Sequence, residues 1–125
     1  MKPTERGFAH LRLATQYSMQ GLRAAWRYEE SFRQEALIAM VGIPLAFVLA
    51  RNTVDFVILV LPLLMLMAAE LGNSAIEAVV DRMGEEYHEL SGRAKDLGSA
   101  MVFMTILMVV VSWSSVALSV FYFSR

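Results

Sequence analysis

The segment ELGNSAIEAVVDR at residues 70–82 decides the fold, because it brings charged side chains into the end of a long apolar run. Residues 56–69 carry no charge, and between Leu71 and Val80 the only charged residue is Glu77. An apolar helix of this length is typical of a membrane span. A carboxylate near the middle of a bilayer costs about 2.5–3.5 kcal/mol on insertion scales. Glu70 and Glu77 therefore indicate a functional site within the span.

The polar residues of this segment share one helix face. At 100° per residue, Glu70, Ser74, Glu77 and Asp81 fall within about 60° of one another, with Asn73 beside them. This face must contact other polar groups.

Composition places the chain among membrane proteins, because 57% of its 125 residues are hydrophobic. We predict a single all-α membrane domain covering residues 1–125. The absence of cysteine excludes disulfides and thiolate metal sites. The first 35 residues are rich in charge and lack a long apolar core, so no cleavable signal peptide is expected.

Four helical segments are predicted along the chain. Residues 8–28 alternate apolar and basic positions at helical spacing, which predicts an amphipathic surface helix within residues 1–28. A helix packed on a soluble core is the alternative for this segment. Three spans are expected at residues 29–51, 56–80 and 97–123, and the polar residues 81–96 connect the last two.

Basic residues predict the orientation of the chain in the membrane. Nine lie in the chain up to Arg33, near the start of the first span, or in the 81–96 connection, and only two lie on the opposite side. The nine are Lys2, Arg6, Arg12, Arg23, Arg27, Arg33, Arg82, Arg93 and Lys95, and the two are Arg51 and Arg125. The positive-inside rule then places the N-terminus in the cytoplasm and the C-terminus outside.

Three spans leave Glu70 and Glu77 poorly shielded from lipid, so we expect the chain to form oligomers. Small residues around the polar face allow helices to approach closely. They are Ala68, Ala69, Gly72, Ser74, Ala75 and Ala78.

Several common sites are excluded by sequence. The chain has no phosphate-binding G-x-x-x-x-G-K-[ST] loop and no G-x-G-x-x-G. His88 and Glu89 begin a zinc-protease motif, but Gly92 stands in place of its second histidine. The basic residues adjoin lipid-like segments, so no nucleic-acid partner is expected.

The remaining polar residues suit a hard cation and a phosphate. Carboxylate and amide oxygens of Glu29, Glu77 and Asn73 are the ligands that Mg²⁺ prefers. Lys95 could neutralise phosphate charge, and Glu70 could exchange a proton with a lipid hydroxyl.

Each of these assignments has a structural alternative. Glu29 could pair with Arg33 at i,i+4 spacing, and Lys95 with Asp96 could simply cap the third span. Glu70, Asn73 and Glu77 could make hydrogen bonds between helices. The acidic residues Glu85, Glu86 and Glu89 are typical of a solvated surface.

Four segments resemble the small bacterial integral-membrane diacylglycerol kinases. They are GLRAAW at 21–26, FRQE at 32–35, NSAIEAVVDR at 73–82 and EYHELSGRAKDLGSA at 86–100. The resemblance implies a homotrimer in the bacterial cytoplasmic membrane with active sites shared between subunits. It implies transfer of the γ-phosphate of MgATP to diacylglycerol, which gives phosphatidic acid.

The resemblance also implies roles for individual residues. Glu70 is the implied catalytic base, Glu29 and Glu77 hold magnesium, and Asn73 and Asp81 support the site. Residues implied to serve the nucleotide are Tyr17, Glu29, Glu77, His88, Lys95 and Asp96. Residues implied to lie near the lipid headgroup are Glu35, Glu70 and Ser99.

The chain departs from the family pattern in its N-terminal helix. Met19 and Gln20 replace a tryptophan and a lysine, and His10 replaces an arginine near the lipid site. The resemblance therefore does not extend to headgroup contacts by this helix.

Three other functions stay open at this point. An undecaprenol kinase of the same family would share the site. A small proton-coupled multidrug transporter would also carry a glutamate within the membrane, although such transporters usually have four spans. A non-catalytic membrane subunit would leave Glu29 and Lys95 without a role.

Overall fold

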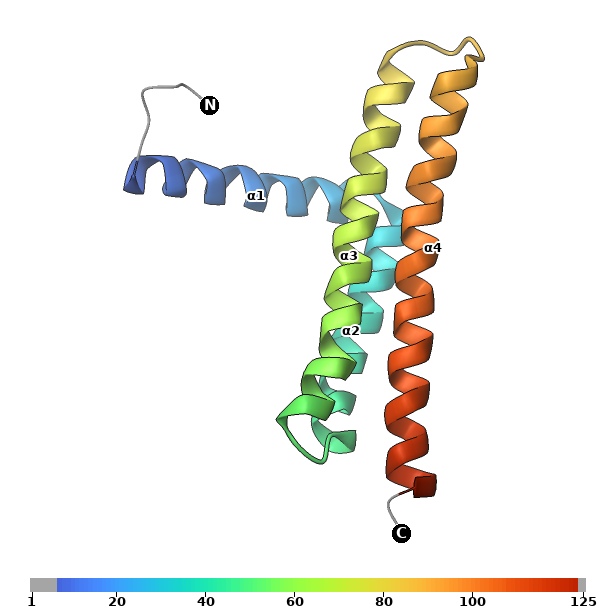
Figure 1. Ribbon diagram of the computed structural model, residues 1–125. Coiled ribbons are helices and arrows are strands. Elements are labelled where there is room, and N and C mark those ends of the chain that lie inside the picture. The colour runs from blue at the N-terminus through green and yellow to red at the C-terminus, as the bar shows by residue number, and fades with distance from the viewer. Residues whose placement is uncertain (1–6, 124–125) are drawn as a thin grey trace.

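The computed structural model describes residues 7–123, which form a three-helix bundle with a fourth helix projecting from one side (Figure 1). The elements are α1 (Phe8–Tyr28), α2 (Glu30–Leu49), α3 (Thr53–Arg82), α4 (Glu89–Leu118) and a short π-helical turn η1 (Ser119–Phe123). No strand occurs among these residues. Lys2, Arg6 and Arg125, which entered the orientation count, lie outside the described part of the chain.

The predicted fold class is confirmed. Helices α2 and α3, and α4 together with η1, are each long and apolar enough to cross a bilayer. They run alternately up and down, so α3 is antiparallel to both of its neighbours (Figure 1).

Helix α1 has the bounds expected from the amphipathic pattern and contacts the bundle only near its C-terminal end (Figure 1). Its sole buried residue is Ala25, while Phe8, Leu11 and Trp26 are exposed. The alternative of a helix packed on a soluble core is therefore wrong. Exposed apolar and basic side chains on one helix are suited to a membrane surface.

The corner between α1 and α2 is formed by Glu29, whose backbone is extended. Its N–H donates to Ala25 O at 2.9 Å, which completes α1. Arg33 from the first turn of α2 donates to Trp26 O at 2.8 Å and Arg27 O at 3.2 Å. A cation on the last carbonyls of a helix is favourable because they carry partial negative charge. Arg33 thus stabilises the corner.

The polar connection is shorter than residues 81–96, because α4 already begins at Glu89. His88 is its N-cap, and His88 Nδ1 accepts a hydrogen bond from Leu90 N at 3.1 Å. This bond satisfies a donor that a helix start otherwise leaves free. As a result, the polar ends of α3 and α4 extend as helices beyond the level of α1 (Figure 1).

At the opposite end, Arg51 of the α2–α3 link contacts both the first turn of α3 and the C-terminal end of α4. Arg51 Nε lies 2.8 Å from Asp55 Oδ2, and Arg51 Nη1 donates to Ser119 O at 3.4 Å. The hydrogen bond with Asp55 raises the pKa of the Arg51 guanidinium above its ordinary value. Asn52 caps α3 by accepting from Asp55 N at 2.9 Å.

Between these ends, the spans pack through apolar side chains and one long-range hydrogen bond. Ala46, Leu59 and Val116 form a small core contributed by all three spans. Beside this core, Trp113 Nε1 of α4 donates to Leu59 O of α3 at 3.0 Å. The bond satisfies the indole donor within the apolar region, where an unpaired donor would be costly.

Replacing Trp113 with Phe should lower the free energy of unfolding by about 0.5–1.5 kcal/mol, because the hydrogen bond to Leu59 O is lost. The measurement is reversible unfolding of the purified protein in mixed detergent micelles. Trp26→Phe on exposed α1 is the matched control and should have little effect. Equal losses for both variants would show that the bond contributes nothing.

Candidate active site

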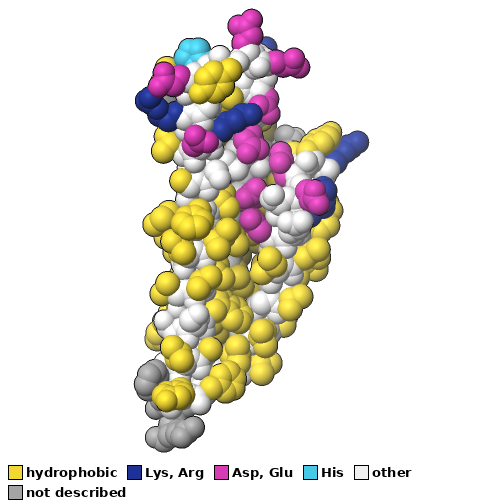
Figure 2. Space-filling view, turned by 90° about the vertical axis from the view of Figure 1, so that its right-hand side faces the viewer, with side chains coloured by type: hydrophobic (Ala, Val, Ile, Leu, Met, Phe, Trp, Pro, Cys, Tyr) yellow, Lys and Arg dark blue, Asp and Glu magenta, His cyan; other side chains and the backbone are white. Residues whose placement is uncertain are grey.

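Four glutamates from three segments converge where α1 joins the bundle. This acidic cluster consists of Glu29 at the corner, Glu35 of α2, and Glu70 and Glu77 of α3. The side chains of Glu35 and Glu70 interact directly, and the charges of Glu29 and Glu77 both act on Glu70. Figure 2 shows acidic side chains gathered in the upper part of the molecule, above a face of hydrophobic side chains. The shared face predicted on residues 70–82 therefore points at other acidic groups.

Burial in this region falls on Glu70 and on one carboxyl oxygen of Glu35. Glu70 is 6% exposed, and Glu35 Oε2 is buried with no hydrogen-bond donor among the described residues. A buried carboxyl oxygen without a donor is costly in a folded protein. It marks a place where a polar ligand would be stabilised.

The Glu29 carboxylate forms no ion pair within residues 7–123 and can therefore bind a ligand. The alternative of a Glu29–Arg33 ion pair is wrong, because the Arg33 guanidinium binds the terminal carbonyls of α1 instead. Within residues 7–123, Glu29 forms no ion pair. The corner thus presents an uncompensated carboxylate beside Glu70.

Asn73 lies beside the cluster, where α3 packs against Gly98 of α4. Its Nδ2 donates to Glu77 Oε1 at 3.3 Å, within one helix. Its Oδ1 is buried and has no donor among the described residues. Gly98 of α4 packs against this oxygen, and a Cβ at Gly98 would overlap Asn73 Oδ1. A glycine is required here for the two helices to enclose Asn73.

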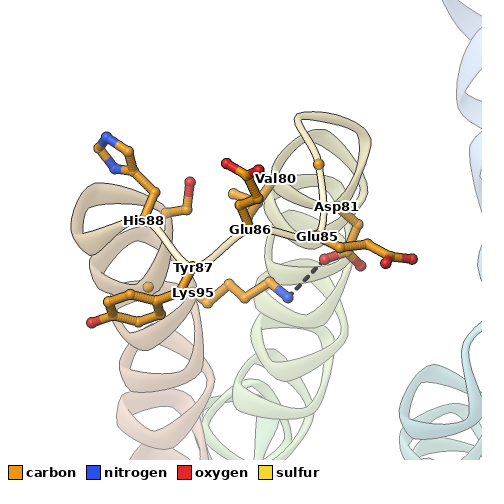
Figure 3. A pocket seen from close by; sticks show the side chains of 10 residues that line it. Val80, Asp81, Glu85, Glu86, Tyr87, His88 and Lys95 are labelled. Carbon is orange, nitrogen blue, oxygen red and sulfur yellow. Dashed lines mark ion pairs between the residues drawn. The ribbon is translucent and has the colours of Figure 1, made fainter.

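A second polar site lies between the projecting ends of α3 and α4. It is a pocket of about 520 Å³ whose lining includes Asp81, Tyr87, His88 and Lys95 (Figure 3). Lys95 Nζ lies 2.7 Å from Asp81 Oδ1, which links α4 to α3. Lys95 also interacts with the charge of Glu77, so the pocket and the acidic cluster adjoin.

The alternative of Lys95 as a helix cap is wrong, because its ammonium binds Asp81 of the neighbouring helix. The His88 ring points away from this ion pair (Figure 3). His88 Nδ1 is occupied by the Leu90 N–H, which leaves only Nε2 for another partner.

Three predicted site residues lie apart from the pocket lining and from the acidic cluster. Tyr17 lies on α1 and Asp96 on α4, both exposed and outside the lining of the pocket. Ser99 is also exposed, next to Gly98 on α4.

The acidic residues expected to form a solvated surface are all exposed, but two of them line the pocket and one forms an ion pair. Glu85 and Glu86 are exposed and line the pocket, while Glu89 pairs with Arg93 at 3.5 Å on the exposed surface.

Sequence reasoning missed Gly98, Tyr87 and Ser91, which also line or shape these sites. Gly98 had only one signal, its position beside polar residues at the start of a span.

The oxygen atoms of this region suit magnesium. Glu29 has a carboxylate free of ion pairs, and Asn73 Oδ1 is a buried oxygen without a donor. Residues 7–123 contain no group of three histidine or acidic side chains arranged as a ready-made metal cage. Mg²⁺ typically uses one or two carboxylates and completes its shell with phosphate oxygens and water. Two protein oxygen ligands, one from Glu29 and one from Asn73, fit this preference of Mg²⁺.

Together, the fold and site define a multi-span membrane protein with an acidic and lysine-containing site at one end of its bundle. The sequence profile of the family described as prokaryotic diacylglycerol kinase matches residues 16–117. The chain belongs to this family.

Curated relatives agree with this assignment. The diacylglycerol kinase of Haemophilus influenzae is 46% identical over 110 residues, covering 88% of this chain and 93% of the relative. That of Escherichia coli K12 is 48% identical over 107 residues, covering 86% and 88%. That of Pseudomonas aeruginosa is 40% identical over 114 residues, covering 91% and 93%. The transporter and non-catalytic alternatives are therefore wrong.

Replacing Gly98 with Ala should destabilise the protein by about 1–3 kcal/mol, because the new methyl group overlaps Asn73. Gly92→Ala in the same helix is the matched control, since its Cβ would meet Tyr87 only at ordinary contact distances of 3.6 and 3.8 Å. The free energy of unfolding of this control should rise by up to about 1 kcal/mol, because Ala has a higher helix propensity than Gly. Unfolding in detergent measures both, and a Gly98→Ala protein as stable as Gly92→Ala would contradict the close packing.

Proposed function

We propose that this protein is an ATP-dependent lipid kinase that transfers the γ-phosphate of MgATP to diacylglycerol and forms phosphatidic acid. The observation that carries the proposal is the acidic cluster at the junction of the surface helix and the spans, with Lys95 adjoining it. Membership in the prokaryotic diacylglycerol kinase family supports the same reaction. Both substrates can meet there, since lipid approaches from the bilayer and nucleotide from water.

The setting of the reaction is the bacterial cytoplasmic membrane. The basic residues of α1 and of the α3–α4 end favour a cytoplasmic N-terminus and a periplasmic C-terminus. This orientation exposes the pocket near Lys95 to cytoplasmic ATP.

In the proposed reaction, Glu70 accepts the proton of the lipid hydroxyl as the hydroxyl oxygen attacks the γ-phosphorus. The bond from this phosphorus to the β–γ bridging oxygen breaks, and ADP leaves with the bond electrons. Glu29 and Glu77 would hold Mg²⁺, which supplies charge neutralisation for the phosphates. Asn73 orients Glu77 through its 3.3 Å hydrogen bond.

Lys95 would stabilise the phosphate charge, and Asp81 would hold its ammonium in position until nucleotide arrives. Tyr17, His88 and Asp96 are proposed to contact the nucleotide, and Glu35 and Ser99 the lipid headgroup. Tyr17, Asp96 and Ser99 are exposed in one chain. We propose that a homotrimer completes the site by bringing such residues from a neighbouring subunit.

The direct test is a phosphorylation assay with purified protein, labelled ATP, magnesium and a panel of lipid alcohols. We expect labelled phosphatidic acid from diacylglycerol. Preferential labelling of undecaprenol would reassign the substrate within the same family. No transfer to any lipid alcohol would overturn the kinase proposal.

Replacing Glu70 with Gln should lower turnover about 10²- to 10⁴-fold, because the amide cannot accept the hydroxyl proton. Trimer assembly and nucleotide binding should be preserved, as measured by sedimentation and by a fluorescent ATP analogue. A variant retaining substantial activity would remove Glu70 as the base.

Replacing Glu29 or Glu77 with Gln should sharply raise the magnesium concentration required for half-maximal activity. The measurement is a magnesium titration at saturating ATP. Glu89→Gln is the control, because Glu89 is an exposed carboxylate paired only with Arg93 among described residues. If all three variants follow the wild-type titration, Glu29 and Glu77 act in packing only.

A further inference from the structure

One ion pair crosses from α4 to α3 at the polar end of the bundle. Lys95 reaches over from α4, and its Nζ lies 2.7 Å from Asp81 Oδ1 on α3 (Figure 3). Both residues line the pocket of about 520 Å³, and Lys95 is the only lysine or arginine in the described lining. The cation best suited to a phosphate in this pocket is therefore already bound to a carboxylate.

The Lys95–Asp81 pair opposes the binding of an anion. A phosphate group that enters the pocket must take the ammonium from Asp81, and the released carboxylate then repels the phosphate. The lining also includes Glu85 and Glu86, neither of which forms an ion pair within residues 7–123. A nucleotide without a metal thus meets three carboxylates and one lysine that is already paired.

A metal ion in the acidic cluster would offer Asp81 a second partner. Asp81 follows Glu77 by four residues on α3, so the two carboxylates are neighbours on one helix face. Mg²⁺ is a hard cation that prefers carboxylate oxygens. A Mg²⁺ held at Glu77, with twice the charge of an ammonium, therefore competes with Lys95 for Asp81.

The same metal would weaken the hold on Lys95 directly. The negative charge of Glu77 acts on Lys95 in addition to that of Asp81, and a bound cation would cancel this attraction. The side chains of Lys95 and Asp81 are 44% and 65% exposed. Exposed ion pairs are weak, so this pair can separate without any change in the packing of α3 against α4.

We propose that Asp81 withholds Lys95 from the nucleotide until magnesium occupies the acidic cluster. The inference rests on the proposed kinase function, and it assigns Asp81 as a positioning residue that makes nucleotide binding depend on the metal. Once the pair separates, the Lys95 ammonium is available to phosphate oxygens. The pocket thereby selects the magnesium complex over the metal-free nucleotide.

Lysine labelling tests the exchange without any turnover. Lys2 and Lys95 are the only lysines of the chain, so acetylation of each by acetic anhydride can be followed by peptide mass spectrometry, with Lys2 as the internal reference. Acetylation requires the uncharged amine, and a neighbouring carboxylate favours the charged form. The rate at Lys95 relative to Lys2 therefore reports whether the pair with Asp81 is closed.

We expect Mg²⁺ alone to raise the relative labelling of Lys95 about threefold in the nucleotide-free wild type, as for loss of an exposed ion pair. Asp81→Asn should show the raised value without Mg²⁺ and no further response. Glu77→Gln should abolish the response to Mg²⁺, and Glu89→Gln is the matched control that should keep it. Sodium chloride at equal ionic strength controls for screening. A wild type that responds to Mg²⁺ no more than to sodium chloride would overturn the proposal.

A second measurement compares binding of a non-hydrolysable ATP analogue in excess Mg²⁺ and in EDTA. We expect Asp81→Asn to bind the metal-free analogue about three to five times more tightly than the wild type, and the magnesium complex with a smaller gain. Glu85→Gln is the matched control, because it removes a carboxylate of the same lining that holds no lysine. Equal gains in both variants would reflect net charge alone and overturn the proposal. A wild type that binds neither form of the analogue would instead refute the proposed kinase function.

Discussion

Carboxyl groups inside apolar helices impose the constraint on which the rest of this structure depends. Removing such groups from water is costly, and like charges close together add to that cost. Glu35 and Glu70 nevertheless lie side by side, with Glu29 and Glu77 acting on the same place. The fold maintains this arrangement through contacts that leave the carboxyl groups unpaired, such as the bonds from Arg33 to the α1 carbonyls and the close packing at Gly98. A cation is what such a site would bind most favourably, and a bound cation could in turn hold phosphate oxygens.

Local sequence patterns predicted much of the fold. The amphipathic period gave α1 its bounds, and uninterrupted apolar runs located three spans. The 100° spacing correctly put Glu70, Asn73 and Glu77 on one side of α3, where they meet other polar groups. These features depend on residues close in sequence, whose relative positions a helix fixes.

Contacts between distant residues could not be predicted in the same way. The bond from Trp113 to Leu59 O and that from Arg51 to Ser119 O join residues 54 and 68 positions apart. Gly98 gives no sign in the sequence that its missing side chain accommodates Asn73. Arg33 had two possible partners nearby, and the choice of the α1 carbonyls over Glu29 depends on the extended backbone at the corner. The early start of α4 similarly depends on capping by His88.

The continuation of α3 past the level of α1 ties the chemistry to membrane thickness (Figure 1). A helix advances about 1.5 Å per residue and is stiff along its axis, so Glu70 keeps a fixed height relative to the rest of α3. The lipid hydroxyl, in contrast, follows the bilayer surface, which differs by a few Å among membranes. A shift of 3 Å is roughly two residues of helix, enough to move the hydroxyl from one side chain to the next. In the proposed reaction, bilayer thickness would therefore decide whether the lipid hydroxyl lies at the depth of Glu70.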